Sequence, residues 1–99
     1  MIKIIALKNG MNLIAETEVG TSYIKIIKPA AIVMQNSPSG EAMIGFSPFL
    51  LYAQEFDTGI IIDNQNFLTL ATPATELLNA YNKYFGSGIQ IADPSILKL

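Results

Sequence analysis

The chain has 99 residues, which is enough for one domain with a single core and too few for two. It is 51% hydrophobic and 14% charged, whereas an average soluble chain carries about 25% charged residues. Because so few charged side chains cannot cover a monomer, we expect part of the apolar surface to be buried between copies of the chain in a homo-oligomer. A small apolar barrel that stays monomeric is the alternative.

The residue types that are missing exclude several classes of function. Without His and Cys, the chain cannot build a Ser-His-Asp or Cys-His catalytic set, a zinc site with nitrogen or sulfur ligands, or a disulfide. It also lacks Arg, and its net charge of −2 predicts no broad electrostatic attraction to nucleic acid. We therefore expect neither an enzyme nor a cofactor.

Nothing in the sequence indicates a membrane or secreted protein. The longest uncharged run, residues 42–54, contains Pro48 and is too short to span a bilayer. The first eight residues hold a short apolar stretch between lysines and lack a small-residue cleavage site, so they do not form a signal peptide. We expect a cytoplasmic protein.

The first 71 residues are rich in branched and aromatic side chains, which favour strands. Segments 2–8 and 11–18 flank Asn9-Gly10, a dipeptide that predicts a hairpin with a type I′ turn. The second strand alternates in polarity, which predicts one solvent face and one core face made by Leu13, Ala15, Thr17 and Val19.

A long apolar run follows, from Tyr23 to Gln35. Lys28-Pro29 interrupts it, and a proline inside a strand implies a sharp bend or an edge. Further strands are predicted at 41–47, 60–62 and 67–71, while the apolar segment 49–53 is compatible with either strand or helix.

The sequence predicts one helix, at residues 73–85. Thr72 is the expected N-cap, Pro73 suits the first helical position, and Gly86 ends the helix. Its apolar stripe is formed by Ala74, Leu77, Leu78, Tyr81 and Phe85. Residues 86–99 are partly apolar and predict an extended tail that either docks on a neighbour or is loose.

No arrangement of acidic residues indicates catalysis or metal binding. The pairs Glu16/Glu18 and Glu55/Asp57 are interpreted as solvated charges. The oxygen-bearing group from Asp57 to Asn66 lacks the spacing of a calcium loop and is better explained by turns.

A weak signal points to single-stranded nucleic acid. Such binders stack bases on aromatic rings while lysines follow the phosphates, and Tyr23 beside Lys25 fits that scheme. The alternative is that most of the aromatic residues belong to the core or to an interface. In a ring, one copy of each contact per subunit would add avidity.

The order of features resembles the Sm-like family. Leu7-Lys8-Asn9-Gly10 precedes a strand, a short loop and a long bent strand, and the ending from Glu76 to Gly88 makes the chain similar to the small Sm-like proteins encoded by cyanophages. The resemblance implies one Sm-like domain over residues 1–99, with a five-stranded, strongly bent antiparallel barrel of SH3-like type over residues 1–71 and a C-terminal helix.

The resemblance also implies an assembly and a ligand. Family members form rings of five to seven copies, in which neighbours pair the edges of their fourth and fifth strands, and they bind single-stranded RNA at the pore. It further implies a phage protein acting in the cytoplasm of a bacterial host.

The chain departs from the family at its RNA-contacting loops. Residues 20–24 replace an acidic residue and a Met-Asn pair, with Tyr23 at the stacking position, and Asp63-Asn64 stands where a cation is usual. Tyr23, Lys25 and Asn64 are therefore the candidate RNA-binding residues. The alternative is a structural or protein-interaction ring that has lost nucleic-acid binding and has an unknown protein partner. A barrel binding a small molecule or lipid is a further possibility.

Overall fold

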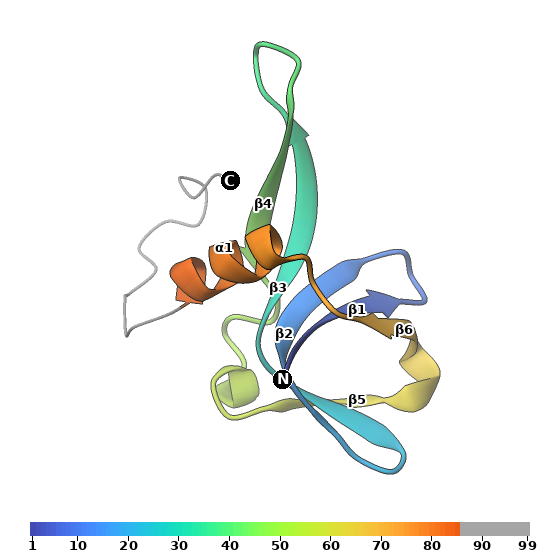
Figure 1. Ribbon diagram of the computed structural model, residues 1–99. Helices are drawn as coiled ribbons and strands as arrows, with labels where there is room; N and C mark the ends of the chain where they lie inside the picture. Colours follow the sequence, from blue (N-terminus) through green and yellow to red (C-terminus); the bar gives the residue numbers. More distant parts are fainter. Residues whose placement is uncertain (86–99) are drawn as a thin grey trace.

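The computed structural model describes residues 1–85, and these form a mainly β protein with one helix at the C-terminal side, as expected (Figure 1). The strands all pair antiparallel, in the order β4-β3-β2-β1-β6, and β5 pairs with β3. The elements are β1 (Ile2–Leu7), β2 (Asn12–Val19), β3 (Tyr23–Asn36), β4 (Ala42–Pro48), the 3-10 turn η1 (Gln54–Phe56), β5 (Ile60–Asp63), the 3-10 turn η2 (Asn64–Asn66), β6 (Phe67–Ala71) and α1 (Thr75–Phe85). The predicted tail lies outside the described residues.

The first hairpin forms where it was predicted, but its turn is not type I′. That turn needs a positive φ at both central residues, and of the two Gly10 alone has one, at 93°. The Gly10 N–H donates to the Leu7 carbonyl (3.1 Å), and the Asn9 side chain accepts from the Met11 N–H (3.0 Å). The loop therefore has three residues and ends in a left-handed glycine, a common alternative in hairpins.

The predicted bend in the long strand is confirmed as a β-bulge. Ile27 pairs with Glu16 and Ala30 with Ile14, so Lys28 and Pro29 together lie opposite the single residue between those partners. Lys28 adopts a positive φ of 50° there. The bulge redirects the strand at a point where Pro29 has no N–H to donate.

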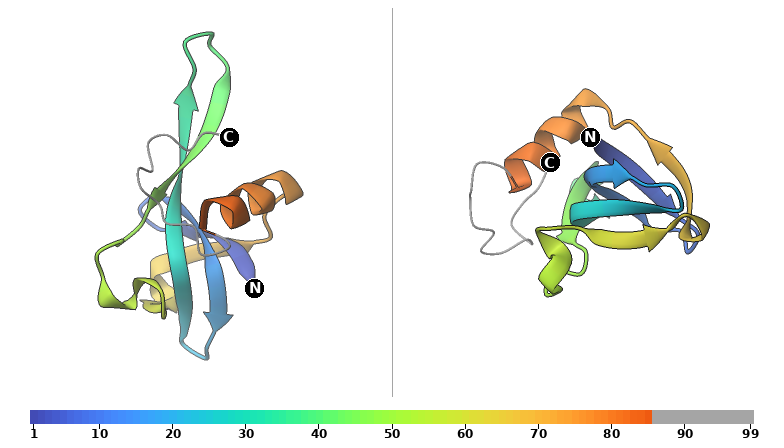
Figure 2. Two further views of the ribbon diagram at one scale, coloured as in Figure 1. Left: turned by 90° about the vertical axis from the view of Figure 1, so that its left-hand side faces the viewer. Right: turned by 90° about the horizontal axis from the view of Figure 1, so that it is seen from below.

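Residues 1–85 form the six strands that the residue pattern predicts, one more than the five-stranded barrel that the resemblance implies, and the bend in β3 decides how two of them pair. The first part of β3 pairs with β5, from Tyr23 opposite Asp63 to Ile26 opposite Ile60. The second part pairs with β4 instead and forms a hairpin that projects from the rest of the molecule (Figures 1 and 2). A single strand thus has two different neighbours on the same side.

The sheet buries a core on each of its two faces. The strands of the path β5-β3-β2-β1-β6 curl into a strongly curved sheet, as the view from below shows (Figure 2). The inner core consists of Ile5, Leu13, Ala15, Ile24 and Ile26, all fully buried. The outer core lies on the opposite face, under α1, and consists of Ile14, Ala30, Phe46, Tyr81 and Tyr84.

Two expectations about burial in β2 were wrong, those for Ile14 and Val19. Ile14 points away from Leu13 and Ala15 and is nevertheless fully buried, because α1 covers the face that the alternation assigned to solvent. Val19 was expected in the core and is 70% exposed, because it lies at the end of the strand.

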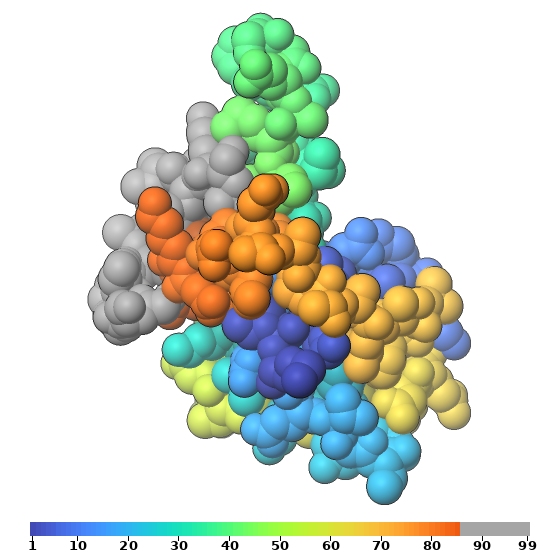
Figure 3. Space-filling model, viewed as in Figure 1, coloured from blue at the N-terminus to red at the C-terminus, as the bar shows by residue number. Residues whose placement is uncertain are grey.

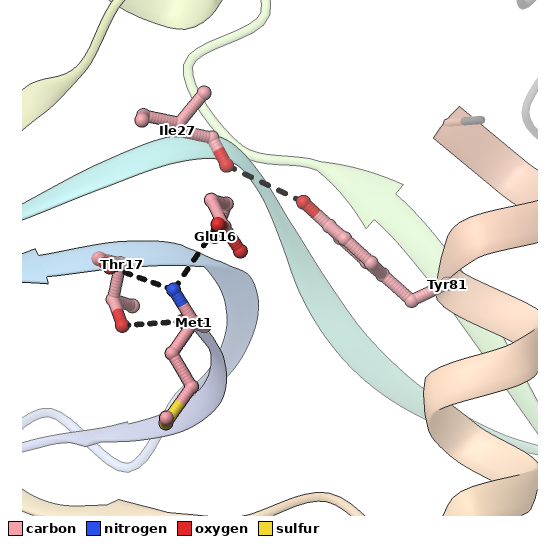
Figure 4. Close-up of polar contacts among 5 residues, drawn as sticks. All are labelled: Met1, Glu16, Thr17, Ile27 and Tyr81. Carbon is pink, nitrogen blue, oxygen red and sulfur yellow. Dashed lines mark hydrogen bonds and ion pairs between the residues drawn. The ribbon is translucent and has the colours of Figure 1, made fainter. Parts of the chain in front are cut away.

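The helix begins at Thr75, two residues later than predicted, and reaches the bulge through Tyr81. The Tyr81 hydroxyl donates to the Lys28 carbonyl (2.8 Å) and also lies 3.3 Å from the Ile27 carbonyl (Figure 4). These carbonyls belong to the bulge, where the ladder between strands is interrupted. Burial of the hydroxyl raises the pKa of Tyr81 to about 12.

Candidate nucleic-acid interface and free strand edges

The three candidate RNA-binding residues lie at the same end of the sheet. Tyr23 and Lys25 share the outer face of β3, because Ile24 between them is buried in the inner core. Tyr23 lies directly opposite Asp63 of β5, and the Asn64 backbone N–H that follows donates to the Ser22 carbonyl (3.1 Å). The loop between β2 and β3 and the end of β5 therefore meet, as the candidate set requires.

The Tyr23 side chain packs over Gly20, the residue that begins the loop between β2 and β3. A Cβ at position 20 would lie 2.4 Å from the ring carbon Cζ, so only glycine lets the ring approach so closely. The Gly20 N–H also donates to the Tyr23 carbonyl (2.8 Å). The Tyr23 ring therefore rests on the backbone at Gly20, and 38% of Tyr23 remains exposed.

Lys25 is held by its neighbours on both sides. Its aliphatic stem crosses Gly59, where a Cβ would lie 2.3 Å from the lysine Cδ and where φ is 134°. Its Nζ lies 3.9 Å from Oε1 of Glu18, the residue directly opposite on β2. An exposed ion pair of this kind contributes little to stability. The Glu18 carboxylate nevertheless offsets the positive charge of Lys25, which is the charge that would attract an RNA phosphate.

The charge balance around the candidate site is therefore negative. Glu18 faces Lys25 and Asp63 faces Tyr23, so two carboxylates accompany one ammonium group. Sequence reasoning missed the pairing of Glu18 with Lys25. The three-residue turn read from the sequence at 20–22 would set Glu18 opposite Ile24. In the structure Gly20 pairs with Tyr23 around a two-residue loop, and this shift of one residue sets Glu18 opposite Lys25.

Asp63 and Glu16 have local structural roles. The Asp63 side chain accepts from the Gln65 N–H (2.9 Å) and caps η2, in agreement with the turn interpretation. The N-terminal ammonium of Met1 lies 3.1 Å from Oε1 of Glu16, and the Met1 carbonyl accepts from the Thr17 hydroxyl (Figure 4). Within residues 1–85, no three or more Asp and Glu side chains gather where they could hold a metal ion.

Three strands have a single paired neighbour among the described residues: β4, which pairs with β3 in the projecting hairpin, and β5 and β6, which end the bent set around the inner core. Within residues 1–85, β5 pairs with β3 alone and β6 pairs with β1 alone. Each carries a large exposed apolar side chain, Ile61 at 57% and Leu68 at 67%. An open pocket of about 450 Å³ lies beside β5, and its lining includes Phe49, Leu50 and Ile61.

No helix in residues 1–85 has the length and apolar character needed to cross a bilayer.

Comparison with known proteins does not add to this description of the site. No protein-family model matches the chain. No curated protein matches it either.

Proposed function

We propose that the protein is a non-enzymatic Sm-like module that works as a homo-oligomeric ring, in which the free edge of β6 in one copy pairs with the free edge of β5 in the next. The observation that carries the proposal is the pair of free edges with Ile61 and Leu68 exposed on them. Pairing the edges satisfies their backbone groups and buries both side chains. The low charge content of the chain is in keeping with such burial.

The topology supports the Sm-like part of the proposal. With the projecting hairpin set aside, β1, β2, β3, β5 and β6 form a strongly bent antiparallel set around one core. In that set β5 and β6 are the fourth and fifth strands, the pair that joins neighbours in the family that the sequence resembles. The hairpin of β4 and the second part of β3 is then an addition to this set.

The assembly is tested by measuring mass in solution. Light scattering and native mass spectrometry at micromolar concentration are expected to give one species of five to seven copies. Leu68→Lys places a charge on the proposed interface and is expected to shift the species to monomer. Val19→Lys is the matched control, because Val19 is equally exposed and lies on β2, between β1 and β3 in the sheet. A monomeric wild-type protein contradicts the proposal.

The charges around Tyr23 favour a ring that binds protein rather than RNA. RNA binding is the second candidate, and the observation in its favour is that Tyr23, Lys25 and Asn64 lie together. A ring would repeat this weak contact in every subunit and multiply it by avidity. Tyr23 would then stack on a base and Lys25 would contact phosphate.

A fluorescence-anisotropy titration separates the two candidates. Labelled A-rich and U-rich single strands are added to the protein at low and at moderate salt. If RNA is bound, Tyr23→Ala weakens binding by about 1–3 kcal/mol per stacked base, whereas Tyr52→Ala, at a 96% exposed tyrosine outside the candidate site, leaves it unchanged. Absence of binding at low salt contradicts the RNA candidate and favours the protein-interaction ring over it.

A further inference from the structure

The projecting hairpin has an apolar face that extends beyond the helix packed on it. The register places Ile32 opposite Phe46, and the next pair of the same face is Met34 opposite Ile44. Phe46 is buried beneath α1, with its ring 5.4 Å from that of Tyr84. Met34 is 67% exposed. Among residues 1–85, the outer core under the helix therefore covers the first of these pairs, while in the second Ile44 packs at its margin and Met34 is left exposed.

A groove of about 470 Å³ begins where the helix starts. Its walls are the first strand, the beginning of β4 and the first turn of α1, and they carry Ile4, Met43, Ile44, Ala74 and Leu77. The single charged group in its lining is Glu76. The tip of the hairpin that forms one wall extends beyond the rest of the molecule, while its base packs against the helix (Figure 3).

We propose that residues 86–99 of the same copy occupy this groove. They follow α1 directly, and α1 is one wall of the groove. The eleven residues of the helix span about 16 Å at 1.5 Å per residue. Fourteen extended residues reach roughly 46 Å, so the chain can run back along the helix and still leave several residues in the groove.

The composition of this segment matches the groove. It has one acidic residue, Asp93, and one basic residue, Lys98, which is of opposite charge to Glu76. Its large apolar side chains are Ile89, Ile91, Ile96, Leu97 and Leu99. Apolar side chains gain by leaving water for an apolar groove, and a lysine beside Glu76 keeps the charged rim paired.

The inference is independent of the proposed ring. The groove lies between the hairpin and α1, whereas the free edges proposed as the subunit interface belong to β5 and β6. Either proposal can therefore fail without the other.

Methyl NMR on the full chain tests the inference. The four methionine methyls are labelled with carbon-13, and a nitroxide spin label is attached through Ser95→Cys, which creates the single cysteine of the chain. Met34 and Met43 are expected to lose signal relative to the reduced label. Met11 is the internal control, because it packs against the inner core. Retention of the Met34 and Met43 signals overturns the proposal.

A mixed sample identifies which copy supplies the segment. Spin-labelled protein without carbon-13 is mixed with unlabelled carbon-13 protein. Loss of the Met34 and Met43 signals in this sample assigns the groove to a second copy and overturns docking within one copy.

A pair of variants tests whether the apolar face does the binding. Met34→Glu in the spin-labelled protein is expected to restore the Met43 signal, because it places a carboxylate opposite Ile44 on this face. Val19→Glu changes an equally exposed residue far from the groove and is expected to leave the loss unchanged. Persistence of the loss in Met34→Glu overturns the role of this face.

Discussion

The two cores of the sheet differ in both composition and origin. The inner core is aliphatic and is made entirely by strands, with Ile24 and Ile26 of β3 meeting Leu13 and Ala15 of β2. The outer core is aromatic and depends on α1, which packs Tyr81 and Tyr84 against Phe46. Contacts between strands alone thus stabilise one face of the sheet, and contacts with the helix stabilise the other. The difference leads us to expect that substitutions on the two faces destabilise the fold in different ways.

The largest effect is expected in the inner core. Ile24→Ala removes a fully buried branched side chain from a core whose buried members all lie on paired strands, so the cavity cannot collapse easily. We expect it to lower the free energy of unfolding by about 2–5 kcal/mol in a urea titration. Val19→Ala, at a 70% exposed position, is the control and is expected to change it by less than about 0.5 kcal/mol. Equal effects would refute the assignment of the inner core.

A smaller effect is expected where the outer core contacts the bulge. Tyr81→Phe keeps the ring and removes the hydroxyl that donates to the Lys28 carbonyl. Because a partly buried carbonyl then lacks its partner, we expect the free energy of unfolding to fall by about 1–3 kcal/mol. Urea titration measures this change, and an unchanged value would mean that water replaces the hydroxyl at the bulge.

Raising the pH tests the same Tyr81 contact without a substitution, because it ionises the hydroxyl that donates to the Lys28 carbonyl. The pKa of Tyr81 is raised by burial from 10 to about 12, so the folded state binds its proton more tightly than the unfolded state does. The resulting stabilisation is fully present below pH 10 and is lost as the pH rises from 10 to about 12. Burial also raises the pKa of Tyr84, which acts in the same direction. Melting temperatures measured across this range are expected to fall, and to fall less steeply in Tyr81→Phe.

The smallest effect is expected at Tyr84. Its hydroxyl is buried and has no hydrogen-bond partner within residues 1–85, so Tyr84→Phe removes a polar group that contributes nothing to the outer core there. We expect the free energy of unfolding to stay within about 0.5 kcal/mol of wild type or to rise. A loss as large as that of Tyr81→Phe in the same titration would show that the Tyr84 hydroxyl has a partner.

The sequence predicts local elements better than it predicts which elements cover each other. The β-branched runs, Asn9-Gly10 and Lys28-Pro29 correctly indicated strands, a hairpin and a bend, because these depend on neighbouring residues. The burial of Ile14 was missed, because it depends on a helix more than sixty residues away. For the same reason Tyr84 was left out of the predicted helical stripe, while Ala74, which was included, is exposed.

The candidate site shows the same limit. The resemblance named Tyr23 and Asn64 as candidates one by one, and the structure adds that they lie at the same end of the sheet. The groove beside α1 had no sequence signal, because it arises where distant segments meet. The edges of β5 and β6 were indicated by the resemblance alone, because no local residue pattern shows which strands lack a second neighbour.

The bulge at Lys28-Pro29 divides β3 into two segments with unequal protection against local opening. Before it, the strand is flanked by β2 and β5 and lies over the inner core. Beyond Ala31, where its pairing with β2 ends, β4 is its one paired neighbour within residues 1–85. Amide hydrogens near Gln35 should therefore exchange with solvent through fraying of the hairpin, while those near Ile26 should require opening of the whole sheet. One continuous strand would then show two exchange regimes, with the boundary just beyond the bulge, at Ala31.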